Sequence, residues 1–307
     1  MRKAFANNWD LYLLLVPVIA YFIIFAYWPM FGVQIAFKDF KSAPGIWGSP
    51  WTAQHGLKHF IRFFNSSQFI NIVWNTISIS IYSLVARFPI PIILALLINE
   101  LKSVKFKKTV QMVTYAPHFL STVVLVGMIS VLFSAPSALM ETGGIVNTII
   151  IKLGMQPIKF VTDPGWFKHL YVWSGIWQST GWGSIIYIAA LAGIDIQQYE
   201  AAMVDGATKM QRLIHVTLPG IMPTAITLFI LDVGKIMNVG FEKVFLMQNG
   251  LNLSAAQVIS TYVYDVGLKG AEYSFSTAVG LFNSAINFAL LIAVNNISRK
   301  VSETSLW

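Results

Sequence analysis

The chain contains no cysteine, so it can form neither a disulfide bridge nor a thiolate metal site. It is also poor in charge, because Asp, Glu, Lys and Arg make up 11% of its 307 residues, whereas a soluble domain carries about 25%. Hydrophobic residues make up 56% of the chain. This composition does not suit a surface covered by water and predicts one covered by lipid.

Motifs for catalysis are missing as well. There is no glycine-rich phosphate loop of the GxxxxGK type, and the five histidines form no metal-binding cluster with a carboxylate. The net charge of +8 is not accompanied by a basic stripe with interleaved aromatics, as a nucleic-acid-binding surface would be. Basic residues that orient the spans in a membrane explain this charge better. We therefore expect no enzymatic activity, no bound cofactor or metal, and no nucleic-acid partner.

Long apolar segments dominate what is present. A membrane-spanning helix needs about 20 predominantly apolar residues. The first apolar run is too long for the core of a signal peptide, so it is interpreted as a retained span. The sequence predicts an all-α, polytopic membrane protein with a single domain over residues 1–307 and six spans, at about 11–31, 70–98, 110–133, 170–194, 219–239 and 275–297.

The distribution of basic residues predicts the orientation of these spans. An even number of spans places both termini on one side of the membrane. A basic cluster, Lys102–Lys108, lies in a short connection on that side. Because positive charges in short loops favour the cytoplasmic side, we expect both termini to be cytoplasmic.

The segment Glu200–Pro223, EAAMVDGATKMQRLIHVTLPGIMP, is polar at its start, helix-prone, and placed between two long apolar segments. A helix there is predicted to lie on the membrane surface, within reach of a soluble partner. Glu200 is expected near the helix start, where the helix dipole favours a carboxylate. Gly206 is predicted to form a turn between two short helices, and Pro219 to open the next span. The plainer interpretation is an ordinary amphipathic cytoplasmic loop.

Glu200-Ala201-Ala202, Gly206 and Leu218-Pro219 resemble the EAA loop of bacterial ABC importer permeases. The resemblance implies a coupling helix that docks on an ATPase subunit, formed by Glu200, Ala201, Ala202, Asp205, Gly206, Leu218 and Pro219. Further stretches are similar to permeases for alginate and pectin oligosaccharides, which are related to the maltose permeases: Pro29–Phe40, Asn75–Leu101, Thr114–Ser121, Trp182–Pro219 and Val239–Gly267.

This resemblance also implies partners. It implies a second homologous permease subunit, two ATPase subunits that bind ATP and Mg, an extracytoplasmic solute-binding protein, and an oligosaccharide substrate whose charge stays open. The location implied is the bacterial cytoplasmic (inner) membrane, among its lipids. The alternative function is an ion-coupled secondary sugar transporter with Asp232 and Lys235 as an ion relay, although no internal repeat typical of such carriers is visible.

Polar and aromatic residues inside the spans are candidates for the substrate path, because intramembrane polar groups usually face a bundle interior or a wet cavity. They are Trp173, Trp177, Gln178, Asp232, Lys235, Asn238, Asn283 and Asn287. Each has a structural alternative: a salt bridge for the Asp232 and Lys235 pair, an aromatic belt for the tryptophans, and helix packing for the asparagines. Arg87, next to Pro89 and Pro91, is interpreted as structural at a kink.

Overall fold

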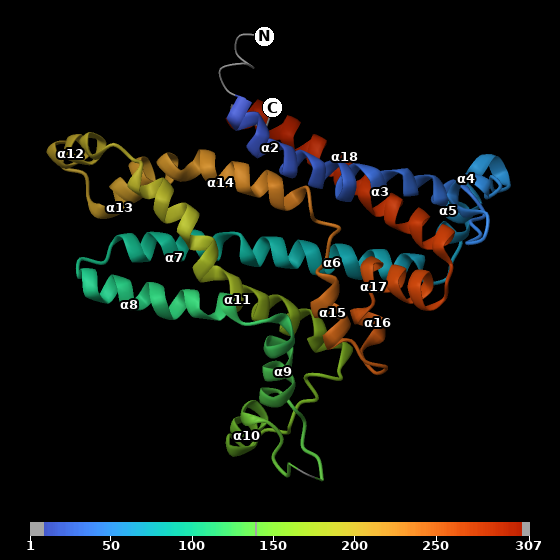
Figure 1. Ribbon diagram of the computed structural model, residues 1–307. Coiled ribbons are helices and arrows are strands. Elements are labelled where there is room, and N and C mark those ends of the chain that lie inside the picture. The colour runs from blue at the N-terminus through green and yellow to red at the C-terminus, as the bar shows by residue number, and fades with distance from the viewer. Residues whose placement is uncertain (1–8, 139, 303–307) are drawn as a thin grey trace. The chain divides into compact units, whose positions relative to one another are not determined.

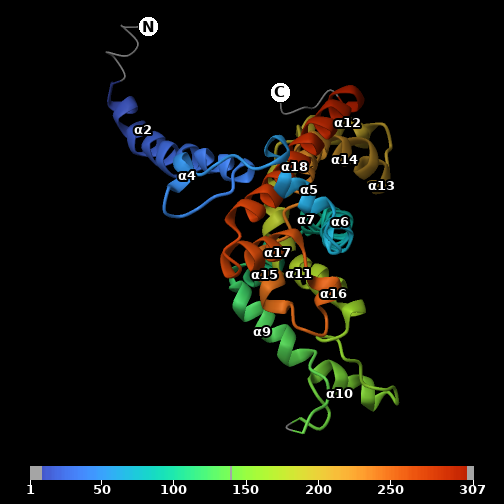
Figure 2. The same ribbon diagram turned by 90° about the vertical axis from the view of Figure 1, so that its right-hand side faces the viewer.

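The computed structural model describes residues 9–138 and 140–302. Within these ranges the chain is helical and has no extended strand, only two isolated bridges, which confirms the all-α prediction. The chain divides into two compact units: the first comprises the residues up to Phe69 together with Val263–Phe282, and the second comprises Ile70–Tyr262 together with the residues from Asn283. Figures 1 and 2 show the helices of both.

The first unit begins with a long apolar helix that is α-helical over most of its length and includes a π-helical and a 3-10 turn. The most apolar window of Leu11–Phe37 has no residue buried within the chain, as suits a helix surrounded by lipid or by another subunit. The unit contains α2 (Trp9–Phe22), η1 (Ile23–Tyr27), α3 (Trp28–Met30), η2 (Phe31–Phe37), α4 (Gly45–Gly48), η3 (Gln54–Gly56), α5 (Lys58–Phe64), η6 (Asp265–Lys269) and the start of α18 (Tyr273–Ser302).

Aromatic packing and ion pairs stabilise this unit. The Phe63 ring is buried, and its centroid lies 5.0 Å from that of Phe69 and 5.5 Å from that of Phe282. The Arg62 guanidinium donates to both carboxylate oxygens of Glu272, which joins two segments far apart in the sequence. These contacts seat α5 against the first turns of α18.

The second unit is built around the long helix α11 (Pro164–Ala192), which contacts α7, α8 and α14. Figure 1 shows α7 and α8 running next to each other in opposite directions. Besides α11 and the end of α18, the unit contains α6 (Phe69–Arg87), α7 (Pro89–Asn99), α8 (Val104–Tyr115), η4 (Ala116–Phe119), α9 (Thr122–Leu132), α10 (Ile145–Lys152), α12 (Ile196–Val204), α13 (Lys209–Arg212), η5 (Leu213–Thr217), α14 (Leu218–Val233), α15 (Phe241–Met247), α16 (Leu253–Ala256) and α17 (Ile259–Tyr264).

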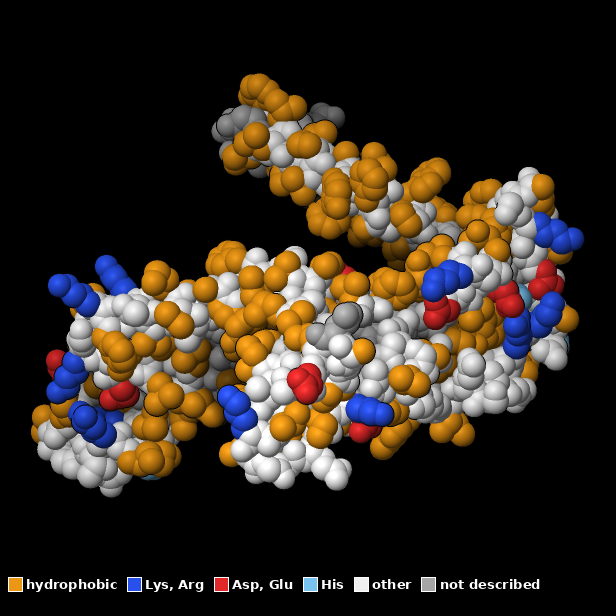
Figure 3. All heavy atoms as spheres, turned by 90° about the horizontal axis from the view of Figure 1, so that it is seen from below, with side chains coloured by type: hydrophobic (Ala, Val, Ile, Leu, Met, Phe, Trp, Pro, Cys, Tyr) orange, Lys and Arg blue, Asp and Glu red, His pale blue; other side chains and the backbone are white. Residues whose placement is uncertain are grey.

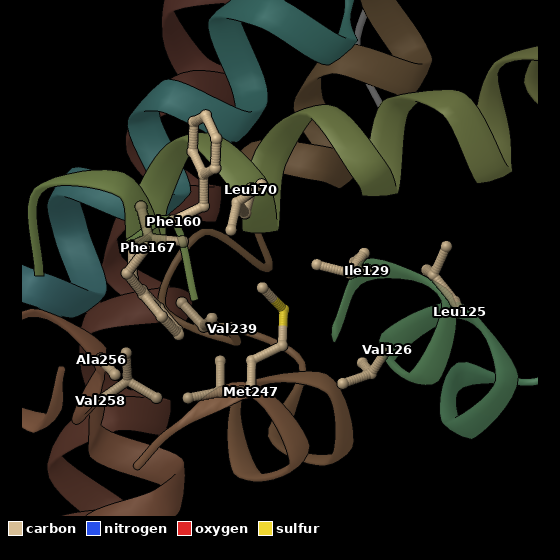
Figure 4. Packing of buried hydrophobic residues seen from close by; sticks show 12 residues of the cluster. Leu125, Val126, Ile129, Phe160, Phe167, Leu170, Val239, Met247, Ala256 and Val258 are labelled. Atoms are coloured by element: carbon tan, nitrogen blue, oxygen red, sulfur yellow. The ribbon is translucent and has the colours of Figure 1, made fainter. Parts of the chain in front are cut away.

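Close packing explains the glycine in the middle of α11. A Cβ atom at Gly181 would overlap the backbone carbonyl of Thr114 in α8, so only glycine allows these two helices to approach this closely. A hydrophobic cluster of α9, α11 and α15 lies further along, where Ile129, Phe167 and Met247 meet (Figure 4). Burial of such side chains is the main stabilising contribution within the unit.

Four helices in the described ranges are long and apolar enough to cross a membrane, and the number rises to six if each of two bent helix pairs counts as one span. The four are 11–37, 69–99, 209–233 and 273–300.

On the face shown in Figure 3, hydrophobic side chains form broad exposed areas and charged side chains are sparse. Exposed apolar surface of this extent fits contact with lipid.

The predicted third span, 110–133, is not one straight helix. The chain breaks after η4, and the two flanking helical segments meet at an angle of 97°. Pro117 at the start of η4 cannot supply a helical backbone hydrogen bond, and Ser121 begins a new helix by accepting a bond from the backbone N–H of Val124 at 3.3 Å.

The predicted fifth span, 219–239, is too long at its end, because α14 stops at Val233. Gly234 follows, and a Cβ there would lie 2.6 Å from the Leu291 side chain of α18, so the chain passes very close to that helix. Lys235 therefore lies in a turn beyond the helix rather than on a helical face shared with Asp232. The fourth and sixth predicted spans correspond to α11 and α18 with ends shifted by a few residues.

Candidate functional site

The polar loop between α11 and α14 begins with a capped helix. The Asp195 carboxylate caps α12 by accepting from the backbone N–H of Gln197 at 2.9 Å. Glu200, expected near the helix start, lies instead in the middle of α12, so the favourable interaction with the helix dipole belongs to Asp195. The Glu200 and Ala201 side chains are exposed and Ala202 is half-buried, so most of this part of the loop is open to contact.

Gly206 forms the turn after α12, as the sequence predicted. Its φ of +76° lies in the left-handed region that glycine adopts without strain. The N–H of Ala207 bonds to the carbonyl of Ala202 at 2.9 Å, and the N–H of Gly206 bonds to that of Met203 at 3.1 Å. This pattern is a Schellman motif, which satisfies the carbonyls at the end of α12 and reverses the chain.

A second capped helix follows at once. Thr208 and Gln211 form a capping box at the start of α13, in which the Thr208 N–H donates to the Gln211 side chain at 2.7 Å. The Tyr199 and Thr217 hydroxyls bond at 3.0 Å and so tie α12 to η5. Leu218 and Pro219 are the first two residues of α14. The loop is thus a pair of short, capped helices joined by a tight turn, which we call the α12–α13 loop (residues 195–217).

The α12–α13 loop carries a shallow groove of about 290 Å³ next to exposed apolar side chains. Small residues and polar groups line the groove together: Ala202, Asp205, Gly206, Ala207, Gln211, Arg212, His215 and Val216. Val204 is 88% exposed and Met210 is 63% exposed. Exposed apolar anchors around small and charged residues are typical of a protein-docking surface.

A polar cavity of about 520 Å³ lies within the second unit, in the size range of ligand sites. Its walls come from α6, η4, α11, the end of α14 and the turn that follows it, and α15. Of the residues predicted for the substrate path, Gln178, Asp232, Lys235 and Asn238 line it. The Gln178 amide donates to the carbonyl of Leu120 at 2.8 Å, which leaves its oxygen as an acceptor. Hydroxyls of Ser80, Ser83 and Ser179 add donors and acceptors.

The charges of this cavity are unequal. Arg87, Lys235 and Lys243 line it together with a single carboxylate, Asp232. Among the residues that the structure describes, no ion pair within 4.0 Å joins any of these groups, including the Asp232 and Lys235 pair that the sequence suggested. The cavity therefore carries excess positive charge.

Lys243 is the buried cation of the cavity. Its ammonium donates to the backbone carbonyl of Tyr171 at 2.7 Å and lies 4.7 Å from the centre of the Tyr171 ring. Burial lowers the pKa of Lys243 to about 8, and the nearby charge of Arg87 lowers the pKa in the same direction. At neutral pH the ammonium is still mostly protonated, so it contributes a positive charge in a partly dehydrated wall.

The other predicted path residues lie elsewhere. Trp173 and Trp177 line a separate apolar pocket of about 390 Å³. The Trp173 indole N–H donates to the Tyr82 hydroxyl of α6 at 2.8 Å. The Asn283 and Asn287 amides donate to the Asn238 side-chain oxygen at 3.0 and 3.1 Å, which joins α18 to the turn after α14.

Three residues of the cavity were missed by sequence reasoning as candidate ligand groups. Arg87 was interpreted as structural, yet its side chain is exposed and lines the cavity. His118 stacks on Trp182 with ring centroids 4.5 Å apart. Lys243 lies outside the predicted spans. The signal for Arg87 was available, because a charge in an otherwise apolar segment is costly unless it faces a wet cavity.

Long apolar helices, an exposed capped loop and a polar cavity are together typical of a membrane transport subunit. The family of binding-protein-dependent transport system inner membrane components matches residues 11–303, and the chain belongs to this family.

Two proteins of Bacillus subtilis (strain 168) are similar over nearly the whole chain. Protein LplB is 42% identical over 98% of this chain and 92% of its own length. The polygalacturonan/rhamnogalacturonan transport system permease protein YteP is 41% identical over 97% of this chain and 90% of its own length.

Solved structures agree with these relatives. One chain in the crystal structure of a bacterial alginate ABC transporter, in complex with alginate pentasaccharide-bound periplasmic protein, matches with a TM-score of 0.88 and 39% identity over 99% of both chains. A chain of the MetNI methionine ABC transporter matches with a TM-score of 0.54 and 15% identity over 76% of this chain and 95% of its own, which supports the fold alone.

Proposed function

We propose that this chain is one permease subunit of an ATP-driven importer that moves oligosaccharides into the cytoplasm. The observation that carries the proposal is the exposed, doubly capped α12–α13 loop, which offers a docking surface that a lone secondary carrier does not need. The relatives named for polygalacturonan, rhamnogalacturonan and alginate transport support the cargo class. A cavity lined by hydroxyl and amide groups suits sugar hydroxyls.

In this proposal the chain crosses the bacterial inner membrane six times, with the bent segment from α8 to α9 counted as one span, α11 alone as the next span, and both termini in the cytoplasm. The basic cluster Lys102–Lys108, which covers the connection after α7 and the first turns of α8, then lies on the cytoplasmic side, as the positive-inside rule requires. The α12–α13 loop lies on the same side and serves as the coupling helix, with Glu200, Ala201, Ala202, Asp205 and Gly206 at the ATPase contact. Leu218 and Pro219 connect it to α14.

The proposed mechanism is alternating access. A second permease subunit completes the pore, and a solute-binding protein delivers the sugar from outside. Two separate ATPase subunits bind ATP and Mg, and their closure moves the α12–α13 loop. Because that loop continues into α14, its displacement reaches Asp232 and the turn that lines the cavity. ATP must favour one of two arrangements of the cavity for this coupling to work.

Reconstitution tests the proposal. The chain, purified with the subunits that accompany it, is placed in liposomes with the binding protein and a labelled oligosaccharide mixture. We expect uptake that requires ATP and persists when a protonophore collapses the proton gradient. Uptake that requires a proton or sodium gradient and ignores ATP would instead support the secondary carrier, with Asp232 and Lys235 as the first residues to substitute.

A further inference from the structure

The unpaired positive charges of the cavity indicate what kind of sugar it accepts. Lys243 is buried and has three N–H donors, of which the described residues accept one, through the carbonyl of Tyr171. Removing an ammonium from water is costly unless an anion or strong acceptors compensate. A ligand carboxylate in the cavity would supply that compensation.

Arg87 provides the second cation. It lines the same cavity from α6, and its charge lowers the pKa of Lys243. No hydrogen bond or ion pair engages its guanidinium among the described residues. A guanidinium can hold a carboxylate through two parallel hydrogen bonds, so it adds geometry as well as charge.

We propose that Arg87 and Lys243 form a carboxylate-binding site in the cavity wall, and that the cargo is an acidic, uronate-containing oligosaccharide. This inference rests on the proposed function, because it assigns the substrate class of the same cavity. The serine hydroxyls and the Gln178 oxygen then bind the neutral hydroxyls of the sugar. Asp232, the single carboxylate of the lining, opposes an anion but leaves the cavity positively charged overall.

The test compares acidic oligosaccharides with neutral counterparts of the same length and linkage. Hydrolysates of polygalacturonate and alginate are used before and after chemical reduction of their carboxyl groups. The transporter is assembled with its accompanying subunits and binding protein, and ATP-dependent uptake of both forms gives a preference ratio. Because the same binding protein is used throughout, its own preference cancels when a variant's ratio is divided by the wild-type ratio.

Arg87→Gln and Lys243→Gln should each lower the preference ratio about tenfold or more, which is the usual effect of losing a charge-assisted hydrogen bond. Arg87→Lys should retain most of it. Lys152→Gln, which removes an exposed charge from α10 outside the cavity lining, should leave the ratio unchanged. Arg87 is exposed, so its substitution should not disturb folding, whereas Lys243 also holds the Tyr171 carbonyl.

Three results would overturn the inference. An unchanged ratio in both glutamine variants, with both sugar forms transported, would show that the cavity does not bind the carboxylate through these residues. An equal loss of acidic and neutral uptake would assign the two cations a structural role, such as pairing with a carboxylate of the second permease subunit. Failure of the wild type to transport any sugar, charged or neutral, would contradict the proposed function itself.

Discussion

Gly206 offers the sharpest test of the α12–α13 loop. Its φ is +76°, and a Cβ atom added there would meet nothing within 4 Å in this chain. Gly206→Ala therefore adds backbone strain without an internal clash. Holding an alanine in the left-handed region costs about 1–2 kcal/mol. That energy shifts the equilibrium between the Schellman turn and other turn conformations by roughly 5- to 30-fold.

Asparagine separates conformation from size at this position. Asn is larger than Ala but tolerates the left-handed region far better. We expect Gly206→Ala to lower substrate-stimulated ATPase activity of the assembled transporter about fivefold or more, and Gly206→Asn to retain most of it. Membrane insertion, measured as chain recovered from washed membranes, should be normal for both.

A matched control comes from the end of α10. Gly154 has a φ of +78° and equally open space at its Cβ, so Gly154→Ala adds the same strain outside the α12–α13 loop. We expect normal ATPase activity from it. A loss in Gly154→Ala as large as in Gly206→Ala would show that strain anywhere is damaging. Equal losses in Gly206→Asn and Gly206→Ala would show that any side chain at this position lowers ATPase activity by disturbing the contact surface, whatever the conformation of the turn.

Three further predictions follow from the helix packing and the cavity. Gly181→Val should prevent stable assembly, because its side chain would enter the Thr114 backbone, and size-exclusion chromatography in detergent should then show aggregated chain. Asp232→Asn should raise the preference for acidic over neutral sugar by up to about fivefold, because it removes a repulsion of about 1 kcal/mol, and a decrease in the uptake ratio would contradict this. The lowered pKa of Lys243, about 8 against an ordinary 10.5, means that the unfolded chain binds more protons between these pH values, so thermal stability in detergent should rise from pH 8 to pH 10. Lys243→Met should remove that rise.

Local patterns predicted the parts of this protein that depend on local physics. Apolar runs revealed the long helices, because lipid requires about 20 apolar residues for each span whatever the tertiary contacts are. Gly206 between two helix-prone stretches indicated a turn, and the structure places a left-handed residue there. The break before α9 also had a local signal in Pro117 and Ser121, although hydropathy alone passed over it.

Features set by packing between distant segments were not predictable in this way. The end of α14 depends on Gly234 lying against Leu291, and the Asn238 side chain is held by two asparagines of α18. The sequence made Trp173 and Trp177 candidates for the substrate path but could not show that both line an apolar pocket. The sequence did not predict that Lys243 lines the cavity, because this lysine reaches the cavity wall only when α15 packs next to Tyr171.

The central claim is that this chain is the permease part of a larger ATP-driven assembly. The most direct test is an affinity pull-down of the chain from its native membrane in mild detergent, with the accompanying proteins identified by mass spectrometry. We predict recovery of a second permease and an ATPase subunit, and a reduced recovery of the ATPase alone from the Gly206→Ala variant. Recovery of the chain by itself, or only with copies of itself, would contradict the account.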